Sequence, residues 1–245
     1  VLDPLNPLSM PPMVTASSAL DVLSHAIESY TAIPYSSRPA PERPGLRPAY
    51  QGANPISDIW SSKAMEMVAA NLVQVVNQPD DLEARGQMML AAAFAGIGFG
   101  NAGVHLPHGM SYPISGLVRS YIPEGYPKDH PIVPHGISVI VNAPAVFRFT
   151  AQANPERHLA AARMLGADTS GAGPEDAGEV LSGRLIDLMK QIEMPNGLGA
   201  LGFTEADIPK LVEGTLPQHR VTKLSPRPAS AEDLAGLFRD AMRYW

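Results

Sequence analysis

Apolar residues recur at helical spacing along most of the chain, and proline-rich segments separate these runs. In the first half the pattern predicts three helices, each beginning near a capping Ser or Asp, over residues 19–31, 57–76 and 82–98. In the second half it predicts three more, over residues 155–165, 174–192 and 230–244. Ser230 and Asp233 have the spacing of a capping box at the last of these. Because helices do not alternate with strands, we expect a mainly α-helical fold.

Four segments do not follow this simple pattern. Residues 34–55 and 119–134 carry prolines that remove backbone donors, so we expect long loops there. The apolar run 136–146 is compatible with either a helix or a buried strand. Residues 86–104 carry no charge, which raises the question of a membrane span. Their five glycines favour instead a buried core helix that breaks into a glycine-rich turn.

The length, net charge and lack of cysteine exclude several classes of protein and of metal site. The chain has 245 residues, 45% of them hydrophobic, which is enough for one large domain or two small ones. Its formal net charge of −6 argues against nucleic acid or an anionic membrane as the main partner. It has no cysteine, so any metal must be held by His, Asp or Glu. The chain begins at Val1 without a signal-peptide pattern, and we expect it to be the C-terminal part of a longer polypeptide.

One set of residues has the spacing of a metal site. Asp21 and His25 stand four residues apart in a predicted helix, so their side chains lie about 40° apart on one face. Four of the seven histidines fall between residues 105 and 135, and His108 and His135 are each followed by glycine. One carboxylate with three imidazoles suits Fe²⁺ or Zn²⁺. The pair Asp-x-x-x-His is common on helices without metal, and the spacing by itself leaves that alternative open.

Successive motifs resemble those of the iron-containing (group III) alcohol dehydrogenases, in the same order along the chain. They are the segments 21–30, 81–85, 95–103, 108–110 and 134–136. Within that family the chain resembles most the hydroxyacid-oxoacid transhydrogenase subgroup, through the segments 47–52, 103–116 and 214–224. The resemblance covers essentially all 245 residues. It implies the helical C-terminal domain of the iron-containing alcohol dehydrogenase and dehydroquinate synthase-like fold.

The resemblance also implies roles for particular residues. The metal ligands would be Asp21, His25, His108 and His135. Many family members have a histidine four residues after the third ligand as a candidate proton carrier, and this chain has Tyr112 there. His105 would line the metal site or contact one of its ligands from outside. An equal alternative is that His105 is a buried histidine whose nitrogens are hydrogen-bonded and which has no role at the site. His158 and His219 lie in polar sequence surroundings and need no role.

The family implies a two-part enzyme. A Rossmann-like N-terminal domain holds most of the nicotinamide dinucleotide (NAD) in the family, and no such domain is found in residues 1–245, which form one helical metal-binding catalytic domain. The subgroup transfers hydride from 4-hydroxybutyrate to 2-oxoglutarate. Their carboxylates need a cationic partner, and the two loops offer five candidates: Arg38, Arg43, Arg47, Arg119 and Lys128. We expect a homo-oligomer located in the cytoplasm or, in a eukaryote, the mitochondrial matrix, acting on small molecules.

Two other functions stay open: an NAD-dependent dehydrogenase of simple alcohols, and a metal-binding or dimerisation fragment without activity.

Two further sequence motifs are present but are rejected as functional sites. The glycines of residues 96–100 resemble a dinucleotide fingerprint but follow an alanine-rich helix where a strand is required. Residues 109–113 resemble a nucleophile elbow around Ser111, but a proline replaces its second glycine.

Overall fold

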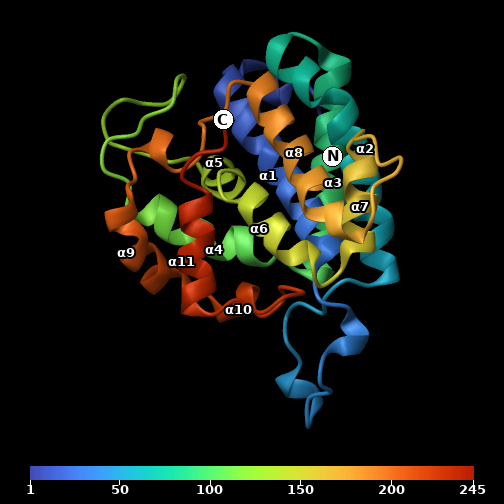
Figure 1. Cartoon of the computed structure of the whole chain (residues 1–245). Coiled ribbons are helices and arrows are strands. Elements are labelled where there is room, and N and C mark those ends of the chain that lie inside the picture. The colour runs from blue at the N-terminus through green and yellow to red at the C-terminus, as the bar shows by residue number, and fades with distance from the viewer.

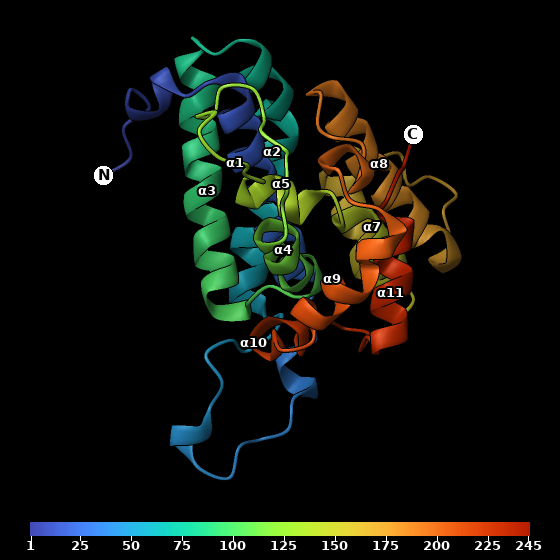
Figure 2. The same ribbon diagram turned by 90° about the vertical axis from the view of Figure 1, so that its left-hand side faces the viewer.

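The computed structural model describes residues 1–245 and is built from α-helices without a β-strand (Figure 1). The mainly α-helical fold is therefore confirmed. The helices are α1 Pro12–Thr31, α2 Pro55–Asn77, α3 Leu82–Ala102, α4 Leu106–Gly116, α5 His135–Ile140, α6 Ala143–Ala151, α7 Pro155–Met164, α8 Ala177–Gln191, α9 Ile208–Thr215, α10 His219–Thr222 and α11 Ala231–Asp240. Figure 2 shows α1, α2 and α3 along one side, α7 and α8 on the other, and α4 and α5 between them. A continuous hydrophobic core draws residues from α1 through to the end of α11.

The first two helices begin earlier than the sequence pattern predicts. α1 starts at Pro12 rather than near residue 19, because proline is well tolerated at the first helical position, where the backbone donor has no partner anyway. α2 starts at Pro55 for the same reason, and its cap is Asn54 rather than Ser57 or Asp58. The Asn54 side chain accepts from the Ser57 backbone N–H at 3.1 Å. At both starts, proline begins a helix and does not break one.

The third helix runs through the glycine-rich segment instead of breaking there. α3 continues to Ala102 and ends at Gly103, whose φ of 91° favours glycine. Inside the helix, Gly98 allows close packing on α2, since a β-carbon there would lie 2.3 Å from the Ser61 hydroxyl. Only one face of α3 is buried, and Ile97 on the other face is 49% exposed. Gly98 therefore serves helix packing, and the predicted break at a glycine comes at Gly103 and not near residue 98.

No single helix is long and apolar enough to cross a membrane. Only α3 and α4 taken together pass a test of length and composition, and they are bent by 105° relative to each other.

The apolar run after the second loop forms two helices, α5 and α6, rather than a strand. Asn142 stands between them, and its side-chain amide donates to the Ser138 carbonyl at 2.8 Å and to the Pro107 carbonyl at 3.3 Å. Gly136 brings α5 against α1, because a β-carbon there would lie 1.9 Å from the Ser17 carbonyl oxygen. This close approach places His135, the first residue of α5, beside α1.

The later helices follow the sequence pattern with small changes. A 3₁₀ turn, Pro174–Asp176, precedes α8, and the predicted capping box at Ser230 and Asp233 is formed at the start of α11. Helix α4 and the short helices α9 and α10 were not predicted. His158 on α7 is fully buried, so its assignment to polar surroundings was wrong.

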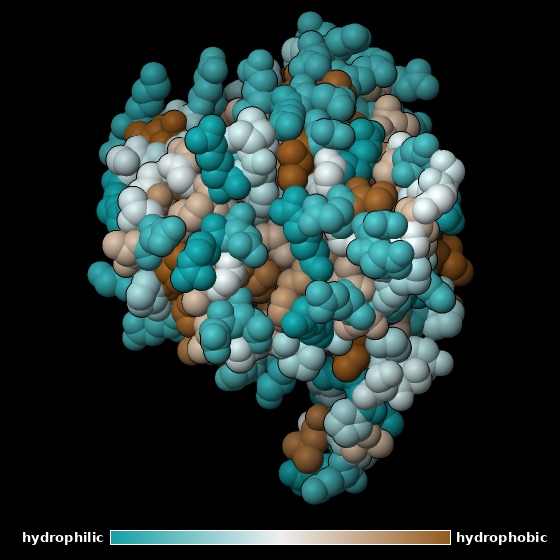
Figure 3. All heavy atoms as spheres, in the orientation of Figure 1, coloured by the Kyte–Doolittle hydropathy of each residue, from teal (hydrophilic) through white to brown (hydrophobic).

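The first proline-rich loop forms an arm, residues 34–53, that projects from the body of the molecule (Figures 1 and 3). Its two ends are joined by the Tyr35 N–H donating to the Ala53 carbonyl at 2.9 Å. Two short 3₁₀ turns, Tyr35–Ser37 and Pro44–Leu46, are its only helical parts. The second loop, between α4 and α5, contains no helix, as predicted.

Candidate metal centre

Helix α1 presents two of the predicted site residues on one face. Asp21 and His25 are one turn apart, and the His25 Nδ1 lies 3.7 Å from the Asp21 Oδ2. The buried residues around them, Leu20, Leu23 and Ala26, pack the opposite side of α1 into the core. Packing of that apolar stripe therefore decides which way the polar pair points.

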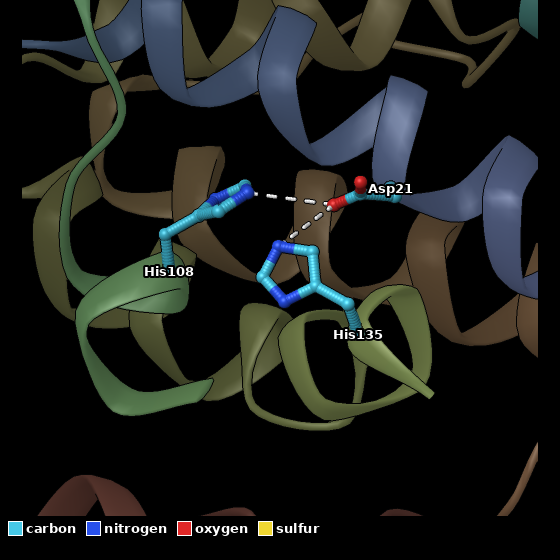
Figure 4. Close-up of side chains that lie close together, drawn as sticks. All are labelled: Asp21, His108 and His135. Carbon is cyan, nitrogen blue, oxygen red and sulfur yellow. Dashed lines mark ion pairs between the residues drawn. The ribbon is translucent and has the colours of Figure 1, made fainter. Parts of the chain in front are cut away.

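Two further histidines reach Asp21 from other helices. His108 comes from the first turn of α4 and His135 from the start of α5, and both point at the Asp21 carboxylate (Figure 4). The Asp21 Oδ1 lies 3.4 Å from the His108 Nε2 and 3.7 Å from the His135 Nε2. One ligand atom from each of the three residues lies within 4.8 Å of the others. The structure thus brings together side chains that are up to 114 positions apart in the chain.

His25 borders this group with a different orientation. Its ring stacks on Phe99 of α3, with centroids 4.0 Å apart, and lies 4.5 Å from the His108 ring. Of the four ligands implied by the family resemblance, three therefore converge directly and His25 forms the adjoining wall.

Two atoms at the centre have no hydrogen-bond partner although they are buried. They are the Asp21 Oδ1 and the His108 Nε2, which face each other. The other ring nitrogen of His108, Nδ1, lies 2.5 Å from the Glu28 carboxylate and so acts as its donor. With Nδ1 protonated, the neutral ring turns an Nε2 lone pair toward a carboxylate oxygen, which is unfavourable unless a cation lies between them. The arrangement fits a divalent metal held by nitrogen and oxygen donors.

The ionisation of these groups follows from the same contacts. Burial disfavours a charged His108, but the carboxylates of Glu28 and Asp21 outweigh it and raise its pKa to about 9. Burial and the neighbouring His108 lower the pKa of His25 to about 4. Burial alone would raise the pKa of Asp21, but the three neighbouring histidines outweigh the effect of burial, so the pKa of Asp21 is lowered. A proton and a metal therefore compete for His108, and metal binding at neutral pH would release a proton.

Glu28 was missed as a functional residue by the sequence reasoning. It follows His25 by three positions on α1, is fully buried, and has no Lys or Arg partner. The available signal was its spacing, since residues 21, 25 and 28 share one helix face. Charged residues are rarely buried without a charged partner, so the burial of this carboxylate in the structure points to a special role.

The two weaker candidates occupy different environments. Tyr112 lies one turn after His108 on α4 and is 38% exposed. His105 is fully buried, and its Nε2 lies 3.1 Å from the Thr31 hydroxyl. His105 thus packs behind the centre, in contact with α1.

The five cationic candidates are spread over the surface. Arg119 is engaged by Asp207, with a shortest contact of 2.6 Å, and Arg38 donates to the Tyr50 carbonyl of the arm. Arg43 and Arg47 are exposed on the arm, and Lys128 is exposed in the loop before α5. None of the five contacts Asp21, His108 or His135 through an ion pair or hydrogen bond.

Both rejected motifs lie in helices. Residues 96–100 are inside α3, so no strand leads into a phosphate-binding turn. Ser111 is inside α4, fully buried, and donates its hydroxyl to the His108 carbonyl at 2.7 Å. Neither segment has the geometry that its motif requires.

Comparison with known proteins agrees with the motif order. Residues 49–242 match the Fe-containing alcohol dehydrogenase family, C-terminal. The whole chain is 58% identical to the mitochondrial hydroxyacid-oxoacid transhydrogenase of Homo sapiens and 59% to that of Pongo abelii, and covers 53% of each. It thus spans about half the length of these curated relatives.

The fold is similar to that of solved structures. The crystal structure of a 1,3-propanediol oxidoreductase matches with a TM-score of 0.81 and 29% identity, over 98% of this chain and 54% of that one. An iron-containing alcohol dehydrogenase from Thermococcus thioreducens matches with a TM-score of 0.73 and 28% identity, over 98% of this chain and 53% of that one. Together with the family match, these similarities show that the chain belongs to the iron-containing alcohol dehydrogenase family.

Proposed function

We propose that this chain is the metal-binding half of an oxidoreductase that transfers hydride between a hydroxyacid and an oxoacid through NAD. The observation that carries the proposal is the pair of buried, partnerless atoms Asp21 Oδ1 and His108 Nε2, with His135 beside them. The names of the relatives supply the substrate class, because those at 58–59% identity are called hydroxyacid-oxoacid transhydrogenases.

The protein's own residues would hold and orient the reacting groups. Asp21, His108 and His135 would bind the metal, with His25 as the fourth ligand. A bound Fe²⁺ or Zn²⁺ supplies Lewis acidity toward a substrate hydroxyl or carbonyl oxygen. The His135 side chain is 49% exposed and that of His108 only 4%, so substrate would arrive from the His135 side while His108 closes the inner wall. Phe99, stacked on His25, shields the centre from water on the α3 side.

The proton of the substrate hydroxyl needs a route to solvent. Tyr112 is our candidate carrier because it lies one turn from His108 and reaches the surface. His105 is buried against Thr31, so it would support α4 and not touch substrate. Lys128, in the loop that leads to His135, is the cationic residue we favour for a substrate carboxylate, since Arg119 is already paired.

The remaining expectations concern the larger assembly. NAD would be bound mainly by the part of the relatives that lies outside this chain, and we expect a homo-oligomer. The relatives are named mitochondrial, and we propose the matrix as the location in a eukaryote.

Metal analysis of anaerobically prepared protein tests the metal site. We expect about one Fe²⁺ or Zn²⁺ per chain. The same analysis of His130→Ala is the control, because His130 belongs to the same stretch of histidines but is exposed and pairs only with Asp129. Wild-type protein with no bound metal after reconstitution would refute the metal site.

Enzyme assays test the reaction. A form extended to the length of the relatives should oxidise 4-hydroxybutyrate while reducing 2-oxoglutarate, without added free NAD⁺. Oxidation of simple alcohols with free NAD⁺, and none of 4-hydroxybutyrate, would support the simple-alcohol alternative. A metal-loaded, NAD-bound protein that transfers no hydride would support an inactive fragment. Micromolar affinity of the 245-residue chain itself for NAD in calorimetry would contradict the division into two halves.

A further inference from the structure

The carboxylate of Glu28 lies in the protein core, and all the hydrogen bonds that it accepts come from one helix. It is fully buried, and no Lys or Arg lies within ion-pair distance of it. Its Oε1 accepts from the His108 Nδ1 at 2.5 Å, and its Oε2 accepts from the His105 backbone N–H at 2.6 Å and from the His108 backbone N–H at 3.4 Å. All three donors belong to the start of α4.

This contact replaces a missing helix cap. His105 is the N-cap of α4 and makes no capping hydrogen bond with its own side chain. Glu28, from α1, takes that place across 77 positions of sequence. A carboxylate at the positive end of a helix is stabilised by the helix dipole as well as by the two N–H groups. Backbone capping therefore explains why Glu28 is tolerated in the core, but it does not explain the third contact, to the His108 ring.

The ring contact determines which nitrogen of His108 is free. A carboxylate only accepts hydrogen bonds, so the Nδ1 facing Glu28 must carry the proton. The unprotonated Nε2 of the neutral ring then faces the Asp21 Oδ1 at 3.4 Å. Asp21 and Glu28 are seven residues apart, two turns or about 10 Å along α1, so the two carboxylates hold the ring of His108 at both ends.

We propose that Glu28 is a positioning residue, which fixes His108 as the Nδ1–H tautomer and aims its Nε2 at the metal centre formed with Asp21. This inference rests on the proposed metal site. Carboxylates that hold a ligating histidine from behind orient the ring and increase its basicity, and their loss commonly lowers metal affinity about 10- to 100-fold.

The variant Glu28→Gln separates the two roles of Glu28. Its side-chain oxygen can still accept from the N–H groups of His105 and His108, so α4 stays capped. Its amide then points an N–H toward the His108 Nδ1, which favours the Nε2–H tautomer and blocks Nε2 as a ligand. We expect zinc affinity to fall about 10- to 100-fold. The melting temperature of the metal-free chain should fall as well, because the ring of His108 loses a charged partner.

Thr31→Val is the matched control. Thr31 lies one turn further along α1 and its hydroxyl bonds to His105, not to His108. The variant removes a buried hydrogen bond to a neighbouring histidine, so it should lower the melting temperature and leave zinc affinity unchanged. An equal loss of zinc affinity in Thr31→Val and Glu28→Gln would mean that Glu28 acts only through stability, and would overturn the proposal.

Nitrogen-15 correlation spectra give a readout that a merely structural role would not change. The zinc-loaded wild-type chain should show His108 protonated at Nδ1, and so should the neutral ring in the metal-free chain. A wild-type His108 protonated at Nε2 would overturn the proposal even if Glu28→Gln failed to fold. Wild-type protein that binds no zinc but shows the Nδ1–H tautomer would refute the metal site while supporting the positioning role.

Discussion

Two histidine groups of the chain, the metal centre around His108 and the site of His158, are chemically different because their partners differ. At the candidate metal centre His108 lies between the carboxylates of Asp21 and Glu28. Between α6 and α7, by contrast, His158 lies between the Thr150 hydroxyl, 2.9 Å from its Nε2, and the Asn154 carbonyl, 2.7 Å from its Nδ1. The carboxylates raise the pKa of His108 to about 9 despite burial, whereas burial lowers the pKa of His158 to about 4.

The difference lies in what each site leaves unsatisfied. Both ring nitrogens of His158 have neutral partners, and its ring packs edge-on against Phe147. His108 and Asp21 each leave one buried atom without a partner. Burial of a histidine therefore does not indicate function by itself. Two buried atoms that face one another without a hydrogen-bond partner do, because a proton or a metal ion must lie between a ring nitrogen and a carboxylate oxygen.

The largest effect is expected from removing two ligands together. In His108→Ala with His135→Ala, two of the three converging groups are lost, so we expect metal content to fall from about one per chain to almost none. Elemental analysis after anaerobic reconstitution measures this. The comparison variant is His158→Gln, which should keep its metal. Full metal retention in the double variant would show that the two histidine groups do not differ as proposed.

The second prediction concerns stability at acid pH. The folded-state pKa of His158 is about 4, below the value near 6.5 of an unfolded histidine. Its stabilising effect is fully present above pH 6.5 and is lost as the pH falls toward 4, because only the unfolded chain then takes up the proton. The loss is at most about 3 kcal/mol.

Urea unfolding of wild-type and His158→Gln protein between pH 7 and 4.5 checks this. The free energy of unfolding should depend less steeply on pH in the variant. Some dependence should remain, because His25 and His105 also have pKa values of about 4. Identical slopes in the two proteins would contradict the assignment of a neutral, buried His158.

Removing the hydroxyl partner of His158 should have a moderate effect. Thr150→Val keeps the shape of the side chain but leaves the His158 Nε2 without a partner, at a cost of about 1–3 kcal/mol. The melting temperature should fall, and the zinc affinity should stay at the wild-type value. A drop in zinc affinity would show that the two histidine groups are coupled.

The smallest effect is expected at the edge of the metal centre. Phe99→Leu removes the ring on which His25 stacks but keeps an apolar side chain. A stacked aromatic pair contributes about 0.5–1.5 kcal/mol beyond its buried area, so we expect zinc affinity to fall by no more than about tenfold. Unchanged affinity together with full loss in His25→Ala would show that the stacking is not needed to orient His25.

Much of the fold could be predicted because helical periodicity is a local property. The segments that form α7, α8 and α11 were recognised from apolar spacing and capping residues alone. The early starts of α1 and α2 were missed for a local reason, because Pro12 and Pro55 are the first residues of these helices. Other errors occurred where a distant contact overrides a local preference. Gly98 stays helical because it packs on Ser61 of α2, and the run after the second loop becomes two helices because α5 packs on α1 through Gly136.

The candidate site was predicted in part. The spacing of Asp21 and His25 follows from one helix, and the resemblance to the family added His108 and His135. Glu28 could not be recognised in the same way, because its partners at the start of α4 are about 80 positions away. The sequence shows that Glu28 shares a helix face with Asp21 and His25, but not which donors meet it there.

The sequence by itself determined the helical class, the absence of any thiolate ligand, and the helix face on which residues 21, 25 and 28 lie together. These follow from composition and from the 3.6-residue period, which need no distant contact. Only the tertiary structure decided that α4 and α5 bring His108 and His135 to Asp21, and that one buried histidine meets carboxylates while another meets hydroxyl and carbonyl groups. The physical reason is that pKa and metal-binding capacity depend on the partners within a few ångströms, and packing chooses those partners.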